Sequence, residues 1–200
     1  MSYGKTVGRN PDQADLRQWW RTPQELFGVL HSVFNFTVDA CASPDNALLP
    51  RFWTKEDDAA KQSWQGERVF CNPPFGGIAP ILAKAPTASV AVFLLPLTAL
   101  TTRYFGQTPA PYVLIPPYRI RFTPPEGLTV RTISPSLGTV VLLFGEVASN
   151  QLVGLSSLGW LHYSYRQKSD NASETPHSKA SCVHAGCHSV RYSEPVTADT

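Results

Sequence analysis

The tetrapeptide Asn72-Pro73-Pro74-Phe75 carries the side chains best suited to chemistry in this chain. It follows the apolar run Val69-Phe70-Cys71, which predicts a short buried strand, and two glycines come directly after it. Each proline removes a backbone donor and holds φ at about −65°, so the carbonyls of Asn72 and Pro73 are not consumed by a strand ladder. The Asn72 side-chain oxygen and a fixed carbonyl could accept both hydrogens of an exocyclic NH2, and the Phe75 ring could stack on the base that carries it. The alternative is a structural Pro-Pro turn that ends a strand.

Acidic residues at two further places could contact a ligand. Asp39 lies near the end of a predicted strand over residues 35–42, and the small residues that follow it leave room for a ligand to approach the backbone. A second acidic group, Glu56-Asp57-Asp58, precedes a predicted helical turn over 59–64. The alternative for this triplet is a solvated helix N-terminus, where acids suit the helix dipole.

Basic residues gather in the second half of the chain. Residues 103–131 carry four arginines and a single acid, Glu126. Arg119 and Arg121 alternate with apolar residues in a predicted strand over 118–122, so both could leave the same face. A basic edge with nearby aromatics suits a DNA backbone. The alternative is an ordinary exposed strand face.

Composition limits the class of protein. With 200 residues, 42% hydrophobic and 16% charged, the chain suits one folded domain of ordinary size. The net charge of +2 does not by itself indicate nucleic acid. There is no apolar run of about 18 residues and no apolar segment at the N-terminus, so we expect a cytoplasmic protein without a membrane span. Cys41 and Cys71 each end an apolar run and are expected to be buried free thiols.

The predicted elements that position these residues alternate between helix and strand. A helix is expected over residues 23–33, with Thr22 as its cap, Pro23 at the first helical position and Glu25 completing a capping box. Further helices are predicted over 78–85 and 98–105, and further strands over 89–95, 112–115 and 139–144. This alternation predicts an α/β sandwich with a mostly parallel sheet and flanking helices.

Three segments are expected along the chain: a flexible N-terminal segment (1–18), a folded domain (19–166) and a disordered tail (167–200). The tail contains Cys182, His184, Cys187 and His188, which are metal-capable ligands. Their spacing matches no familiar zinc pattern, so no metal is predicted.

Taken in order, the motifs resemble those of the phage-type DNA N6-adenine methyltransferases, the small Dam-like enzymes of phages and prophages. Four features carry the resemblance: Trp20-Arg-Thr-Pro23, Val38-Asp-Ala-Cys-Ala42, Thr54-Lys-Glu-Asp-Asp58 with Trp64, and Val69-Phe-Cys-Asn-Pro-Pro-Phe75. Leu94-Leu-Pro96 and Arg119-Ile-Arg-Phe122 add to it downstream. The resemblance covers residues 17 to 146.

The resemblance implies a Rossmann-like methyltransferase fold and the cofactor S-adenosyl-L-methionine. The implied reaction is methyl transfer to the N6 amine of adenine in DNA, with the target base flipped into the Asn-Pro-Pro-Phe pocket. The implied setting is the cytoplasm of a bacterial host cell, with DNA as partner and no obligate protein partner. The same tetrapeptide also serves enzymes that methylate adenine in RNA or glutamine in proteins, and a catalytically inactive DNA-binding relative is a third alternative.

Residue roles follow from the same resemblance. The residues that correspond to the family's target-amine site are Asn72, Pro73, Pro74 and Phe75. The DNA contacts expected at Arg119 and Arg121 depend instead on the basic edge described above. The residues that correspond to the family's cofactor site are Trp20, Thr22, Pro23, Asp39 and Ala40, together with Asp57 or Asp58. The chain departs from the family pattern in lacking a Gly-x-Gly turn after Asp39 and in having Phe75 where Tyr is commoner.

Overall fold

The computed structural model describes residues 20–123 and 138–164. The expected flexible segment 1–18 and the expected tail 167–200, with its cysteine and histidine cluster, lie outside the described residues, and so does Arg131. Across the described ranges, no helix combines the length and the apolar character needed to cross a membrane.

A six-stranded sheet forms the centre of the fold, with strand order β1-β2-β3-β5-β4-β6. The strands are β1 (Val38–Asp39), β2 (Arg68–Cys71), β3 (Val90–Pro96), β4 (Tyr112–Ile115), β5 (Thr139–Gly145) and β6 (Leu161–Ser164). The two longest, β3 and β5, are buried along almost their whole length and pair with each other. The predicted strands over 89–95, 112–115 and 139–144 are therefore confirmed.

Strand direction divides the sheet into two halves. The β1–β2 and β2–β3 pairs are parallel, whereas β5 runs antiparallel to both β3 and β4, and β6 runs antiparallel to β4. Strands β1 to β4 consequently point the same way. This agrees with the expected α/β class, but the sheet is mixed, because an antiparallel strand lies between β3 and β4.

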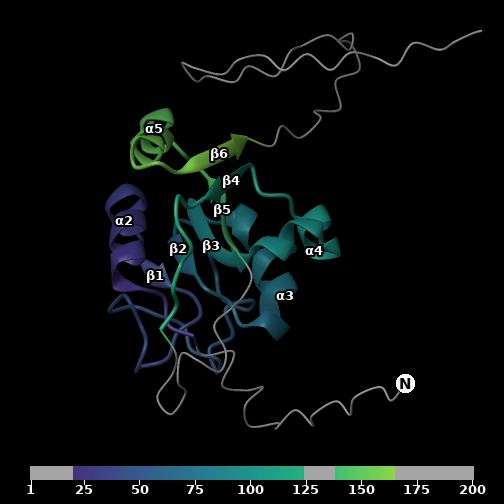
Figure 1. Cartoon of the computed structure of the whole chain (residues 1–200). Coiled ribbons are helices and arrows are strands. Elements are labelled where there is room, and N and C mark those ends of the chain that lie inside the picture. Colours follow the sequence, from purple (N-terminus) through teal and green to yellow (C-terminus); the bar gives the residue numbers. More distant parts are fainter. Residues whose placement is uncertain (1–19, 124–137, 165–200) are drawn as a thin grey trace, which may run out of the picture. The chain divides into compact units, whose positions relative to one another are not determined.

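Helices cover both faces of this sheet (Figure 1). Helices α2 (Gln24–Phe34) and α5 (Ser149–Ser157) lie on one face, while α3 (Ile78–Leu82) and α4 (Arg103–Gln107) lie on the other. Short 3-10 turns, η2 (Phe75–Gly77), η3 (Ala85–Thr87) and η4 (Leu97–Thr101), join the elements. Both predicted helices are shorter in the structure. Helix α3 ends at Leu82 and the 3-10 turn η3 follows it, whereas the first part of the helix predicted over 98–105 is the 3-10 turn η4 and α4 begins only at Arg103.

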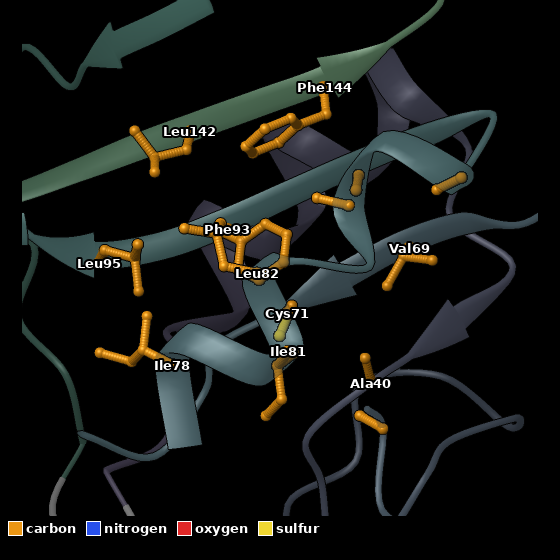
Figure 2. Packing of buried hydrophobic residues seen from close by; sticks show 14 of the residues in the cluster. Ala40, Val69, Cys71, Ile78, Ile81, Leu82, Phe93, Leu95, Leu142 and Phe144 are labelled. Carbon is orange, nitrogen blue, oxygen red and sulfur yellow. The ribbon is translucent and has the colours of Figure 1, made fainter. Parts of the chain in front are cut away.

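Alternation along β3 explains how one strand serves both layers. Phe93 and Leu95 point to the α3 face, where they meet Leu82 and residues of β5, as Figure 2 shows. Val92 and Leu94 point to the α2 face. Since successive side chains of a strand point to opposite faces, an apolar strand buried on both sides needs a helix layer on each.

Helix α2 begins one residue later than the capping prediction requires. Its N-cap position is Pro23, and no side chain caps it, so the predicted Thr22 cap and Glu25 capping box are wrong. The Thr22 hydroxyl is instead engaged with another segment, described below. The helix ends at Phe34. Its C-cap residue Asn35 has a left-handed φ of 49° and donates its N–H to the His31 carbonyl, an arrangement typical of helix C-termini.

The first predicted strand is also shorter than expected. Only Val38–Asp39 pair with β2, because the chain then turns to bond with residues 51–53. The Asp39 N–H donates to the Arg51 carbonyl, and the Asp39 carbonyl accepts from Trp53 N–H. The predicted helical turn over 59–64 is absent, and non-helical turns take its place.

The common direction of β1 to β4 brings their carboxyl ends to one edge of the sheet. Asp39 ends β1 there, and Asn72 follows β2 at the same edge. In open α/β sheets, ligands bind outside the carboxyl ends of the strands. The fold therefore places the two strongest sequence candidates side by side at the edge where a ligand is expected.

Candidate active site

The side chain of Asn72 has a defined orientation. Its amide nitrogen Nδ2 donates to the Thr22 hydroxyl oxygen at 3.2 Å and to the Trp20 carbonyl oxygen at 3.4 Å. A carbonyl can only accept, so the NH2 end of the amide faces Trp20 and Thr22. Within the described residues, neither the Asn72 Oδ1 nor the Pro73 carbonyl receives a hydrogen bond. Two acceptors therefore remain open at this turn.

The segment Trp20–Thr22 is itself anchored. Arg21 and Thr123 form an antiparallel bridge, in which Arg21 N–H donates to the Thr123 carbonyl at 2.9 Å and Thr123 N–H donates back at 3.0 Å. Thr22 is buried, with 8% of its surface exposed. The chain entering α2 thus lies between the end of β2 and the segment that follows β4.

A pocket of about 290 Å³ lies against these residues. Its lining comes from the segment before α2, the turn after β1, the 54–59 stretch and the end of β2 continuing into α3: Trp20, Arg21, Thr22, Asp39, Ala40, Cys41, Ala42, Asn46, Leu48, Thr54, Lys55, Asp58, Ala59, Phe70, Asn72, Pro74, Gly77 and Ile81. Most of the candidate site is therefore gathered around a single pocket.

Some of the predicted site residues lie outside this lining: Pro23, Asp57, Pro73, Phe75, Arg119 and Arg121. Pro73 is buried, so its contribution to a site is limited to its carbonyl and its fixed φ. Phe75 is 57% exposed at the start of η2, between the lining residues Pro74 and Gly77. Its ring is thus available beside the pocket.

Asp39 is the buried acid of the pocket. Only 3% of its surface is exposed, and its Oδ2 accepts from the Leu48 N–H at 3.1 Å. Burial raises the pKa of this carboxyl from 3.8 to about 6, although hydrogen bonds from the backbone of Leu48 and Cys41 oppose the rise. Near neutral pH the pocket therefore holds a negative charge that is poorly solvated.

Asp57 and Asp58, neighbours in sequence, have different partners and different positions relative to the pocket. Asp57 is exposed and closes a turn, accepting from Thr54 N–H at 2.8 Å and Thr54 Oγ1 at 2.9 Å, and these hydrogen bonds lower its pKa. Asp58 has a left-handed φ of 55° and pairs with Lys61 at 3.0 Å, and the hydrogen bond from Lys61 lowers its pKa. Only Asp58 lines the pocket.

Two thiols lie next to each other at the pocket, one in its lining and one behind it. Cys41 and Cys71 are free, their Sγ atoms are 3.5 Å apart, and burial raises the pKa of the Cys71 thiol. Both were predicted to be buried free thiols, which holds fully for Cys71, whereas Cys41 is half-buried and contributes to the pocket wall. In the described ranges, no group of three His, Cys, Asp or Glu side chains converges as a metal site.

The two candidate DNA-binding arginines lie on an irregular segment. The predicted strand over 118–122 is wrong, since β4 ends at Ile115 and two prolines without backbone donors follow. Exposure nevertheless alternates as expected, because Arg119 and Arg121 are exposed and Ile120 between them is 6% exposed. Both arginines lie in the segment between β4 and the Arg21–Thr123 bridge, and Ile120 between them packs into the core on the α2 face.

Several lining residues were missed from the sequence. Phe70 and Ile81 supply an apolar wall, and the spacing of apolar residues in the predicted strand and helix could have indicated them. Leu48 supplies a backbone donor to Asp39 from an irregular turn, for which no local pattern exists. Lys55 brings a basic side chain to the lining, which composition alone could not reveal.

Comparison with known proteins yields two phage relatives. The chain is 33% identical over 73 residues to a DNA N-6-adenine-methyltransferase of Haemophilus phage HP1, a stretch that covers 36% of this chain and 42% of the phage protein. It is 31% identical over 70 residues to a DNA N-6-adenine-methyltransferase of Escherichia phage T1, covering 34% of this chain and 29% of that protein. The matched stretches thus span less than half the length of either relative.

A third relative and one solved structure also match. YfdM of Escherichia coli, named as a methyltransferase, is 34% identical over 64 residues, covering 28% of this chain and 69% of YfdM. A crystal structure from Pyrococcus horikoshii, named as an RNA methyltransferase, aligns with a TM-score of 0.45 at 15% identity over 70% of this chain and 91% of the other.

The fold and site define an α/β protein with a pocket at the carboxyl edge of its sheet. The model of the DNA N-6-adenine-methyltransferase (Dam) family matches residues 10–166, which is most of the chain. The chain belongs to this family, and the expected family is confirmed.

Proposed function

We propose that this chain transfers a methyl group from S-adenosyl-L-methionine to the N6 amine of adenine in DNA. The observation that carries the proposal is the Asn72 amide, which two hydrogen bonds turn so that its oxygen is an open acceptor beside a ligand pocket. Family membership and the names of the two phage relatives support adenine in DNA as the substrate. The phage relatives also support a bacterial cytoplasm as the setting.

The amine chemistry rests on two acceptors. The lone pair of an adenine amine is delocalised into the ring, so the nitrogen is a weak nucleophile. When Asn72 Oδ1 and the Pro73 carbonyl accept its two hydrogens, they draw the nitrogen toward a tetrahedral shape and stabilise the positive charge that develops on it. Since Pro73 is buried and the following Pro74 restricts its ψ, the direction of the Pro73 carbonyl is preorganised.

The exposed Phe75 ring supplies a surface for the target base. An adenine can reach the Asn72 acceptors only after leaving the DNA stack, which costs roughly a few kcal/mol. Stacking on an aromatic ring contributes about 1–3 kcal/mol per base and offsets this cost. Phe75 is 57% exposed, so the base can reach it without a rearrangement of the core.

In our proposal this pocket is the cofactor site. Its volume of about 290 Å³ is near the lower end for small-molecule sites, and its lining combines the apolar side chains Phe70 and Ile81 with the acids Asp39 and Asp58 and the bases Arg21 and Lys55. In our proposal Asp39, with Ala40, faces the methionine part of the cofactor. Asp58 rather than Asp57 accepts a hydrogen bond from the amino group of the cofactor's own adenine. When bound, S-adenosyl-L-methionine supplies the methyl group that the amine receives.

The segment before α2 completes the cofactor site in this proposal. Trp20 and Thr22 line the pocket, whereas Pro23 serves by starting α2 directly after them. Arg119 and Arg121, exposed on the segment that leads to the Arg21–Thr123 bridge, are proposed to contact DNA phosphates.

The substrate class is tested with purified protein and the methyl-labelled cofactor. Duplex DNA, single-stranded DNA, RNA and a glutamine-bearing protein are offered in parallel, and modified nucleosides and peptides are identified by mass spectrometry. We expect N6-methyladenine in DNA. Label found only in RNA or on glutamine would replace the proposed substrate, and cofactor binding without transfer to any acceptor would indicate an inactive relative.

The amine site is tested with Asn72→Ala. Removing one preorganised acceptor is expected to reduce single-turnover methyl transfer by roughly 10²-fold, while cofactor affinity remains largely unchanged. Asn150→Ala, on the exposed face of α5, is the matched control and is expected to behave as wild type. An Asn72→Ala protein with full activity would mean that the tetrapeptide is a structural turn and not the amine site.

The stacking role is tested separately at Phe75. Phe75→Ala is expected to weaken DNA binding and slow transfer, whereas Phe75→Tyr keeps the ring and remains active. Tyr163→Ala removes a comparably exposed aromatic from β6, and we expect no loss. Equal effects of the Phe75→Ala and Tyr163→Ala substitutions would show that exposed apolar area, not stacking at the site, is responsible.

A further inference from the structure

Thr22 makes a contact that neither helix capping nor cofactor binding explains. Its hydroxyl oxygen accepts from the Asn72 amide at 3.2 Å across a sequence separation of 50 residues. The residue is 8% exposed, and its side chain does not cap α2, which begins after Pro23 without a side-chain cap. A buried hydroxyl is usually retained for a hydrogen bond, and within the described residues its bond is to Asn72.

The two partners of the Asn72 amide have different consequences. The Trp20 carbonyl can only accept, so it decides which end of the amide turns inward. The Thr22 oxygen is a second acceptor for the same NH2 group, so it restricts the remaining freedom of the side chain. Together they hold Oδ1 in one position, whereas the Trp20 carbonyl alone leaves the amide freer to rotate.

We propose that Thr22 is a positioning residue that acts on methyl transfer through Asn72, in addition to lining the cofactor pocket. The inference rests on the proposed function, because Asn72 Oδ1 must be the acceptor for the target amine. The hydroxyl hydrogen of Thr22 has no acceptor in the described residues and the residue lines the pocket, so it can donate to a bound ligand. A ligand-to-Thr22-to-Asn72 chain of hydrogen bonds strengthens each member, since successive hydrogen bonds polarise one another.

The first test is a double-mutant cycle in single-turnover methyl transfer at saturating cofactor. Thr22→Val removes the hydroxyl with little change in shape and is expected to slow transfer about fivefold, as the loss of one neutral hydrogen bond predicts. Thr22→Ser keeps the hydroxyl and is expected to restore most of the rate. In an Asn72→Ala background, Thr22→Val is expected to have little further effect, because the group on which it acts is gone.

Two kinetic outcomes would overturn the inference. An equal loss from Thr22→Val in both backgrounds would mean that Thr22 acts independently of Asn72. A loss in the wild-type background that disappears at saturating cofactor would mean that Thr22 only contacts the cofactor. Thr98→Val, an exposed threonine at the same edge of the sheet, is the control and is expected to leave the rate unchanged.

A second measurement does not depend on activity. In protein labelled with ¹⁵N-asparagine, the side-chain NH2 signal that disappears in Asn72→Ala is that of Asn72. We expect Thr22→Val to move this signal and Thr22→Ser to move it less, whereas an unmoved signal would overturn the inference even if transfer is slow. If wild-type protein methylates no DNA, the proposed function fails, and the NH2 signal still decides whether Thr22 holds Asn72.

Discussion

Replacing the buried acid Asp39 by Asn is expected to raise the free energy of unfolding and to weaken cofactor binding at pH 7.5. Burial at 3% exposure raises its pKa from 3.8 to about 6. One pKa unit corresponds to about 1.4 kcal/mol, so ionised Asp39 lowers the free energy of unfolding by about 3 kcal/mol relative to the protonated acid. Because the folded-state pKa lies above the unfolded one, the stabilising contribution is fully present below pH 3.8 and is lost as the pH rises through about 6.

Asp39→Asn removes this titration. The amide offers one oxygen where the carboxylate accepts from the backbone of both Leu48 and Cys41, and the lost hydrogen bond costs about 1 kcal/mol. The expected net effect at pH 7.5 is therefore a gain of about 1–2 kcal/mol in the free energy of unfolding. For a protein of this size, this corresponds to a rise in Tm of about 5 °C.

Urea denaturation of wild type and Asp39→Asn between pH 3.5 and pH 8 measures this difference. Other titrating groups are common to both proteins and cancel, so the wild-type stability relative to the variant is expected to fall between pH 3.8 and about 6. Asp45→Asn, an exposed acid on the following turn, is the control and is expected to follow wild type. Parallel stability curves for wild type and Asp39→Asn would refute the buried-carboxylate reasoning.

Cofactor affinity measured on the same proteins gives the opposite sign. A buried carboxylate near the pocket stabilises a cationic ligand, so Asp39→Asn is expected to weaken S-adenosyl-L-methionine binding about tenfold at pH 7.5. Wild-type affinity is expected to fall as the pH drops below about 6, and the affinity of the variant is not. A variant that binds as tightly as wild type would place the cationic part of the ligand away from Asp39.

Two further predictions concern the DNA surface and the backbone. Changing Arg119 and Arg121 together to Ala is expected to weaken DNA binding on all sequences alike. The slope of log K against log salt concentration is expected to become shallower by up to about two units. Unchanged DNA affinity would show that both arginines are ordinary solvated surface residues. Gly145 has φ of +89°, and an added Cβ would clash with the Ser89 carbonyl oxygen, so Gly145→Ala is expected to cost at least about 2 kcal/mol of unfolding free energy. Gly154→Ala, in α5 with open space around it, is expected to be neutral or stabilising, and similar urea midpoints for the two variants would contradict this.

Apolar periodicity predicted the elements of the fold because burial is encoded locally. Helix α2 and strands β2 to β5 lie where their apolar residues recur at the helical or strand period. Strand direction is not encoded in this way, since a strand buried on both faces reads the same in either direction. The antiparallel course of β5 depends on how the chain returns after β4, so the mixed sheet could not be predicted. Helix α5 and strand β6 were missed, because α5 buries only Leu152 and Leu155 and all of β6 is exposed.

The candidate site was predictable where it depends on strand ends. Asp39 and Asn72 each end or follow a strand, and parallel neighbours bring such residues together. The choice between Asp57 and Asp58 was not predictable, because it depends on the turn closed by Thr54 and on the left-handed φ of Asp58. The partner of Thr22 was assigned wrongly for a similar reason. A local cap competes with a distant amide, and only the folded chain shows which of the two wins.

The pairing of Arg21 with Thr123 has a consequence for the order of folding. The hydrogen bonds that orient Asn72 join residues 52 and 50 positions apart, and Arg21 pairs with a residue farther still along the chain. Closing such long loops costs chain entropy before any contact compensates for it. The β3–β5 pairs join residues 43 to 55 positions apart, whereas the Arg21–Thr123 bridge joins residues 102 positions apart. We therefore expect α2 and the centre of the sheet to form before the bridge that anchors Trp20–Thr22, and the amide orientation to be acquired last. A chain arrested at that stage has its core formed but no acceptor in place, so recovery of activity after refolding should lag behind recovery of helix signal.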